Sequence, residues 1–160
     1  MTKICYLDFD GVLHDEHVYI HPKRGIYIRT AGRVLFEWMP ILDDLLAPYP
    51  DVRIVLSTSW VRTRGFNFAR KQLSPALKER VIGATFHRRL MCRDEFAFIP
   101  RGVQIADDVL RREPEAWFAV DDDYLGWPPS SQGNLVQTDG SRGISDPAVQ
   151  KKIKQFLERF

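Results

Sequence analysis

The chain has 160 residues, of which 44% are hydrophobic and 28% are charged. This length and composition predict a single globular domain over 1–160 with enough apolar side chains for a core. The formal net charge of +2 is too small to indicate nucleic-acid binding by itself. No apolar run approaches the roughly 20 residues of a membrane helix and no signal peptide is visible. Cys5 and Cys92 lie far apart without metal-type spacing, which fits a reducing compartment. We therefore expect a cytoplasmic protein that does not bind membranes.

Two aspartates follow the first apolar run of the chain. Residues 4–7 predict a short buried strand, and Asp8, Asp10 and Gly11 come directly after it. Alternate residues of a strand share a face, so the two carboxylates can point the same way, and Gly11 allows a sharp turn behind them. Such a pair is mutually repelling unless a cation or a bound proton relieves it. The alternative is two solvated acids in a turn, since Asp-Gly is a common turn sequence.

The later elements alternate between helices and strands. Residues 18–20 could pair with 27–29 as a small hairpin that covers the strand end as a flap. Helical spacing of apolar residues predicts a helix over 31–47, which Pro40 should bend or interrupt. Strands are expected over 52–56, 81–85, 117–120 and 135–138, and helices over about 63–73, after Pro100 and from Asp146, with a turn or short helix at 74–75. This alternation predicts an α/β fold with a doubly wound, mainly parallel sheet, a short flap and no large cap domain.

Polar side chains follow three of the expected strands. They are Asp8 and Asp10 after 4–7, Ser57 and Thr58 after 52–56, and Asp121 and Asp122 after 117–120. Ligands of doubly wound sheets bind at the carboxyl ends of the strands, so these groups would converge on one pocket if the strands are neighbours. The alternative for the hydroxyls is capping of the helix that follows them.

These segments together resemble the haloacid dehalogenase-like (HAD) phosphohydrolase superfamily. The matching motifs are D-x-D-G-x-L at 8–13, the strand 54–56 ending in Ser57, and the strand 118–120 ending in paired acids. More narrowly, 8–14 (DFDGVLH), 56–60 (LSTSW), the triple aspartate and 138–144 are similar to the small HAD domains associated with bacterial RNA-repair proteins. The superfamily's third motif is usually a lysine. Here Arg101 occupies the plausible place, and Lys78 is the alternative.

The resemblance implies a Rossmann-like HAD fold and phosphoryl transfer through an aspartyl-phosphate. Asp8 would attack phosphorus, and Asp10 would act as general acid and then as general base. Mg²⁺ would be held by the Asp8 carboxylate, the Asp10 backbone carbonyl and either Asp121 or Asp122, a choice that stays open. Asp123 is expected to be solvated or to act behind these ligands. The transferring phosphoryl would be bound by Ser57, or by Thr58 after a one-residue shift, and by Arg101.

Short spaces after the first and second motifs indicate an open site. They favour a phosphomonoesterase (a phosphoric monoester hydrolase) acting on nucleotides or nucleic-acid ends, with a phosphorylated small molecule or a phosphotransferase reaction as alternatives. No protein partner is predicted. Several basic residues could neutralise a phosphate backbone or be ordinary solvated surface: Arg24, Arg29, Arg62, Arg64, Arg70, Lys71, Arg88, Arg89 and Arg93.

The competing class is a catalytically weak HAD-fold module that binds phosphate or a partner. Arg101 in place of lysine supports it, and the retained acids argue against it. His14 could contact the substrate, although a polar position in the flap is favoured. Trp60 and Trp127 could line the pocket, although packing is the more common fate of such residues.

Overall fold

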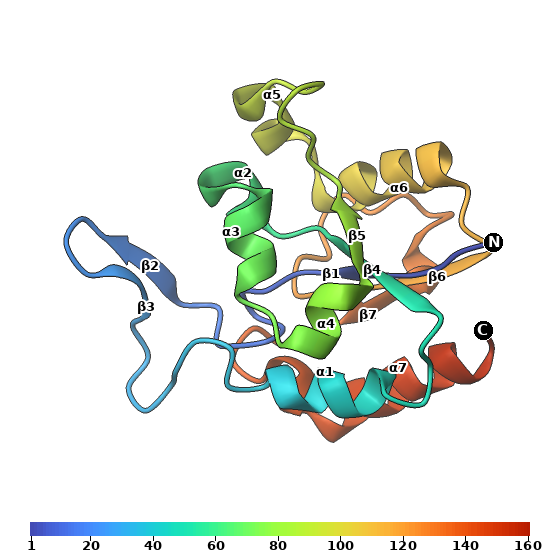
Figure 1. Ribbon diagram of the computed structural model, residues 1–160, viewed down its shortest axis with the longest axis horizontal. Helices are drawn as coiled ribbons and strands as arrows, with labels where there is room; N and C mark the ends of the chain where they lie inside the picture. The colour runs from blue at the N-terminus through green and yellow to red at the C-terminus, as the bar shows by residue number, and fades with distance from the viewer.

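A five-stranded parallel sheet forms the centre of the computed structural model, which describes residues 1–160 (Figure 1). The strand order is β5-β4-β1-β6-β7, and every neighbouring pair is parallel. The strands are β1 (Lys3–Leu7), β4 (Val52–Leu56), β5 (Val81–Ala84), β6 (Ala116–Asp121) and β7 (Leu135–Gln137). In the middle of the sheet, Leu7 pairs with Leu56 on one side and Val120 on the other. The carboxyl ends of β4, β1 and β6 therefore lie side by side.

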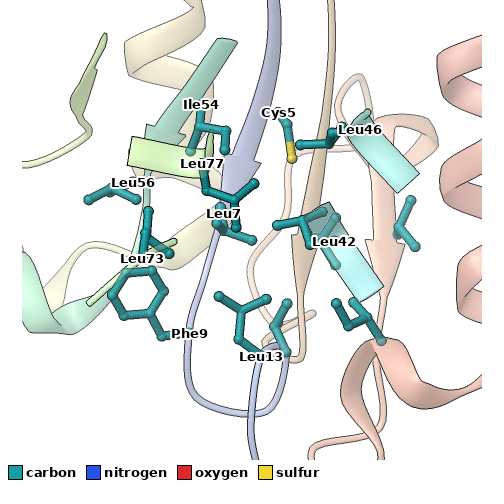
Figure 2. Packing of buried hydrophobic residues seen from close by; sticks show 14 of the residues in the cluster. Cys5, Leu7, Phe9, Leu13, Leu42, Leu46, Ile54, Leu56, Leu73 and Leu77 are labelled. Atoms are coloured by element: carbon teal, nitrogen blue, oxygen red, sulfur yellow. The ribbon is translucent and has the colours of Figure 1, made fainter. Parts of the chain in front are cut away.

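Helices cover both faces of the sheet. On one face lie α1 (Met39–Leu46) and α7 (Pro147–Glu158), and on the other lies α6 (Arg101–Arg112) (Figure 1). The larger core lies on the α1 and α7 side, where Leu42 and Leu46 of α1 come close to Cys5 and Leu7 of β1 (Figure 2). The expected α/β fold with a doubly wound, mainly parallel sheet is confirmed.

Strand β1 is buried on both faces because its side chains alternate between two cores. Cys5 and Leu7 belong to the larger cluster, whereas Ile4 and Tyr6 belong to a smaller one that includes Ile105 of α6. A strand covered on both sides reads as a continuous apolar run, which is the pattern that identifies it in the sequence. Both cysteines are free thiols, Cys5 buried and Cys92 exposed.

The helix expected over 31–47 starts later than predicted. Residues 35–38 form a turn, with a positive φ of 58° at Phe36, and α1 begins only at Met39. Pro40 does not interrupt the helix but lies in its first turn, where no intrahelical partner is needed for a backbone N–H.

The helix expected over about 63–73 is two short helices. They are α2 (Ser59–Arg64) and α3 (Phe66–Lys71), which are separated by Gly65 at φ 98°. That conformation suits glycine and breaks the helix. The expected short helix after Ser74 is α4 (Pro75–Arg80), and α5 (Arg93–Phe98) was not predicted.

The predicted hairpin is present. Strand β2 (Val18–His21) pairs antiparallel with β3 (Gly25–Ile28), and the pair projects away from the central sheet (Figure 1). No large cap domain accompanies it. Two 3₁₀ turns, Gln132–Asn134 and Gly143–Ser145, complete the secondary structure. No helix is both long enough and apolar enough to cross a membrane.

Candidate active site

The strand ends bring the expected polar residues together. The backbone N–H of Asp8 donates to the Val120 carbonyl (3.3 Å), and that of Ser57 donates to the Leu7 carbonyl (2.9 Å). These bonds continue the ladders one residue beyond β1 and β4. Asp8 thus stands between Ser57 and Asp121, the last residue of β6, at one edge of the sheet. This is the edge where doubly wound sheets bind ligands.

Three carboxylates form a tight cluster at this edge. Asp8, Asp121 and Asp122 each offer one oxygen, and these oxygens lie within 4.8 Å of one another. Burial, with repulsion from Asp10, raises the pKa of Asp8. Burial and repulsion from Asp8 raise the pKa of Asp121 well above its usual range. Burial and the neighbouring Asp8 raise the pKa of Asp122 to about 7. A hard cation with oxygen ligands, such as Mg²⁺, fits such a donor set. Asp10 lies outside this cluster, so a contribution from its backbone carbonyl stays a prediction.

Arg101 supplies the positive charge next to the cluster. Its Nη1 lies 2.9 Å from Asp121 Oδ2 and 3.3 Å from Asp8 Oδ1, and its side chain is 14% exposed. Burial would lower the pKa of the guanidinium, but the two carboxylates outweigh it and raise that pKa. Lys78, the alternative, lies on α4 and does not line the pockets at the strand ends.

The residue after Arg101 fixes where α6 begins. Gly102 packs against Trp127, and a Cβ at this glycine would lie 2.6 Å from the Trp127 Cα. A larger side chain would push the start of α6 away from the sheet edge. Close packing at Gly102 therefore holds Arg101 at the acidic cluster.

Asp10 is held by two side-chain donors that the sequence did not indicate. Its Oδ1 accepts hydrogen bonds from His14 Nε2 and Trp60 Nε1, both at 2.8 Å. His14 Nδ1 accepts from the backbone N–H of Phe36 (3.1 Å), so the ring proton lies on Nε2. The expectation that His14 is a polar flap residue is wrong, because its ring is fully buried and both nitrogens are bonded. The packing interpretation of Trp60 is confirmed, with its ring against Phe9, but its N–H reaches the site.

The two hydroxyls after β4 have different surroundings. Thr58 Oγ1 accepts from the Trp60 backbone N–H (3.3 Å) and caps α2, as the capping alternative predicts. Ser57 Oγ is buried and has no hydrogen-bond partner. Buried polar atoms rarely stay unpaired, so this hydroxyl is the one available to a ligand.

Two adjoining pockets open at the site. The first has a volume of about 430 Å³ and no hydrophobic side chain in its wall, which is formed by Asp8, Asp10, Glu16, His17, Ser59, Arg101, Asp122 and Asp123. The second has a volume of about 240 Å³, contains Ser57 and shares Ser59, Arg101 and Asp123 with the first. Glu16 and His17, at the base of the hairpin, were not predicted. Asp123 is exposed, as expected. Trp127 lines neither pocket and is buried.

The strand order, the paired acids after β1 and β6, and the hydroxyl after β4 define a haloacid dehalogenase-like (HAD) domain. A family model described as "HAD domain in Swiss Army Knife RNA repair proteins" matches residues 4–149. The chain belongs to this family, and the resemblance seen in the sequence is confirmed. No curated protein and no solved structure matches the chain.

Proposed function

We propose that this domain is a magnesium-dependent phosphomonoesterase that acts through an aspartyl-phosphate on Asp8. The observation that carries the proposal is the cluster of three carboxylates paired with Arg101. Two buried acids and a third that is partly buried share a single cation, Arg101, so their negative charge is poorly neutralised, and the pKa of each is raised. A structural ion pair would not require the third acid.

The oxygen-only donor set suits Mg²⁺, with Asp8 and Asp122 as the direct carboxylate ligands. Asp121 is less free, because its Oδ2 pairs with Arg101 and its Oδ1 accepts from the Asp123 backbone N–H (3.0 Å). Bound there, the ion would neutralise charge on the carboxylates and on the phosphoryl oxygens.

Asp8 and Asp10 have separate roles in the two chemical steps, which are phosphoryl transfer to Asp8 and hydrolysis of the aspartyl-phosphate. The Asp8 carboxylate attacks phosphorus while the bond to the leaving oxygen breaks, and Asp10 donates a proton to that oxygen. Asp10 then removes a proton from water as the water attacks phosphorus, and Asp8 is released. The Phe9 backbone N–H (2.9 Å) and Arg101 both contact Asp8 Oδ1, which fixes the orientation of the carboxylate. The free Ser57 hydroxyl and Arg101 would donate to phosphoryl oxygens.

The substrate we favour is a nucleotide or a nucleic-acid end. The support is the short hairpin in place of an enclosing cap, together with membership of a family found in RNA-repair proteins. A phosphotransferase would use the same groups and differ only in the acceptor that attacks the aspartyl-phosphate.

The test is hydrolysis of an aryl phosphate with and without Mg²⁺. We expect turnover that requires Mg²⁺, is abolished in Asp8→Asn, and is kept in Asp107→Asn, a control acid exposed on α6. Turnover that survives Asp8→Asn would refute the proposal. If aryl phosphate, phosphorylated oligonucleotides and a metabolite panel are all inert while Mg²⁺ still binds, the competing module that binds phosphate or a partner becomes the better account.

A further inference from the structure

A cleft leads away from the acidic cluster between the start of α2 and the segment that joins α5 to α6. It is the second pocket, of about 240 Å³, and it meets the acidic pocket at Ser59, Arg101 and Asp123. Its wall also contains Arg62 of α2 and Phe98, the last residue of α5, which the acidic pocket does not touch. The two pockets thus adjoin at these three residues and have chemically different walls.

The inner end of the cleft is built to donate hydrogen bonds to an anion. Ser57 Oγ lines it, is buried at 2% exposure, and has no partner. Arg101 lines the same pocket. An unpaired buried hydroxyl in a pocket that also contains a guanidinium is explained by a ligand with anionic oxygens.

The outer end offers a free aromatic face and a free cation. Phe98 is 88% exposed, the highest value among the chain's exposed large hydrophobic side chains apart from Met1. Arg62 forms no ion pair. A phenyl ring so exposed adds little to the core, whereas it can stack on a flat ring.

The segment that carries Phe98 is held in place. The Gln104 side-chain amide donates to the carbonyls of Phe96 (3.1 Å) and Ile99 (2.9 Å), on either side of Phe98. Phe96 itself is buried against Phe86, with ring centroids 5.1 Å apart. The exposed ring therefore sits on a fixed support, which lowers the entropic cost of stacking a ligand on it.

We propose that this cleft binds the terminal nucleoside of a single-stranded nucleic acid whose end phosphate lies at Asp8, with the base stacked on Phe98 and the next phosphate contacting Arg62. The proposal rests on the proposed function for the position of the reacting phosphate. A small phosphorylated metabolite without an aromatic ring could not stack on Phe98. A paired base is already stacked within its duplex, so the chemistry of the cleft favours an unpaired end.

The test is binding of a fluorescein-labelled RNA tetranucleotide with a terminal phosphate, at the 3′ or the 5′ end, measured by anisotropy. The Asp8→Asn protein prevents turnover, and the variants Phe98→Ala, Phe98→Trp and Arg62→Gln are made in that background. Loss of one stacked base weakens binding by about tenfold or more, so we expect that loss in Phe98→Ala and none in Phe98→Trp. In Arg62→Gln the slope of log affinity against log salt should fall by about 0.7. Leu110→Ala, which removes a 76% exposed side chain elsewhere on α6, should bind within about twofold of the parent.

Equal affinity of the parent, Phe98→Ala and Arg62→Gln for the RNA would overturn the proposal. So would binding of the RNA no tighter than that of a phosphopeptide of equal charge. The outcome is separable from that of the proposed function. If the wild-type protein hydrolyses aryl phosphate but RNA affinity does not depend on Phe98, only the proposal for the cleft is refuted. If RNA affinity depends on Phe98 but the wild-type protein hydrolyses no phosphate monoester, only the proposed phosphatase activity is refuted.

Discussion

The hydrogen bonds from His14 and Trp60 to Asp10 should affect the rate at which Asp10 transfers a proton to the leaving group. If Asp10 is the general acid, these two donors hold its carboxyl group where the leaving oxygen will be. Trp60→Phe removes the indole N–H and keeps a large aromatic ring in the packed cluster. A hydrogen bond to a charged group contributes about 1.5–3 kcal/mol, and about 1.4 kcal/mol corresponds to a tenfold change in rate. Loss of the Trp60 donor should therefore lower the rate of the proton-transfer step by about tenfold or more.

The assay compares kcat/KM for two leaving groups. A nitrophenolate departs without a proton, whereas an alkoxide needs one from the general acid. We expect Trp60→Phe to lower kcat/KM by about tenfold for an alkyl phosphate and by less than about threefold for nitrophenyl phosphate. His14→Ala should show the same pattern, with a larger loss of stability because the Phe36 backbone N–H loses its acceptor.

The matched control is Trp127→Phe. Trp127 is also buried and donates its indole N–H, but to the Asp123 backbone carbonyl (2.7 Å) and not to Asp10. The control should leave the ratio of the two kcat/KM values unchanged. Equal losses for both substrates in Trp60→Phe would refute the reasoning, because they would show a general effect on the fold and no effect on proton transfer.

Three further predictions concern the charges around the sheet. Arg101→Ala should lower kcat/KM by about 100-fold or more, and full activity in this variant would contradict the prediction. Arg101→Lys should lower kcat/KM by less, because lysine keeps the positive charge near Asp8 but cannot donate two parallel hydrogen bonds as a guanidinium does. The raised Asp122 pKa of about 7 means that the metal-free protein loses stability as pH rises from about 4 to 7, because folding then opposes ionisation. Mg²⁺ displaces that proton, so the rise in Tm on adding Mg²⁺ should be larger at about pH 8 than at about pH 5 and should vanish in Asp122→Asn; an equal rise at both pH values would be inconsistent. Tyr6→Phe removes a 2.8 Å hydrogen bond to the buried Asp108. This change should lower the free energy of unfolding, measured by urea titration, by about 1.5–3 kcal/mol without changing activity. An unchanged urea midpoint would count against a stabilising role for this bond.

The central strands were the most predictable part of the chain. Strands β1 and β4 are covered on both faces, so their sequences are short apolar runs that end abruptly in acids or hydroxyls. The start of α1 was not predictable, because Leu35 keeps helical spacing while the backbone turns at Phe36. The break at Gly65 is likewise a local conformation that periodicity does not report.

The site was predicted only in part, because some of its contacts depend on tertiary structure that no local sequence pattern reports. Asp8 and Arg101 follow from motif and order, and the structure places them 3.3 Å apart. The contact of Trp60 with Asp10 joins residues 50 positions apart and depends on the direction of one indole N–H, which no local pattern encodes. His14 lies four residues after Asp10, but a tight turn and not a helix brings them together, so the spacing gave no signal.

The central claim is that Asp8 becomes phosphorylated during turnover. We would quench the reaction of the wild-type protein and a phosphate monoester in acid, digest it, and locate the phosphoryl group by mass spectrometry. The account predicts a phosphoryl group on Asp8 that appears only when Mg²⁺ is present, and none in Asp8→Asn. Sustained turnover with no phosphorylated peptide, or with the phosphoryl group on another residue, would contradict it.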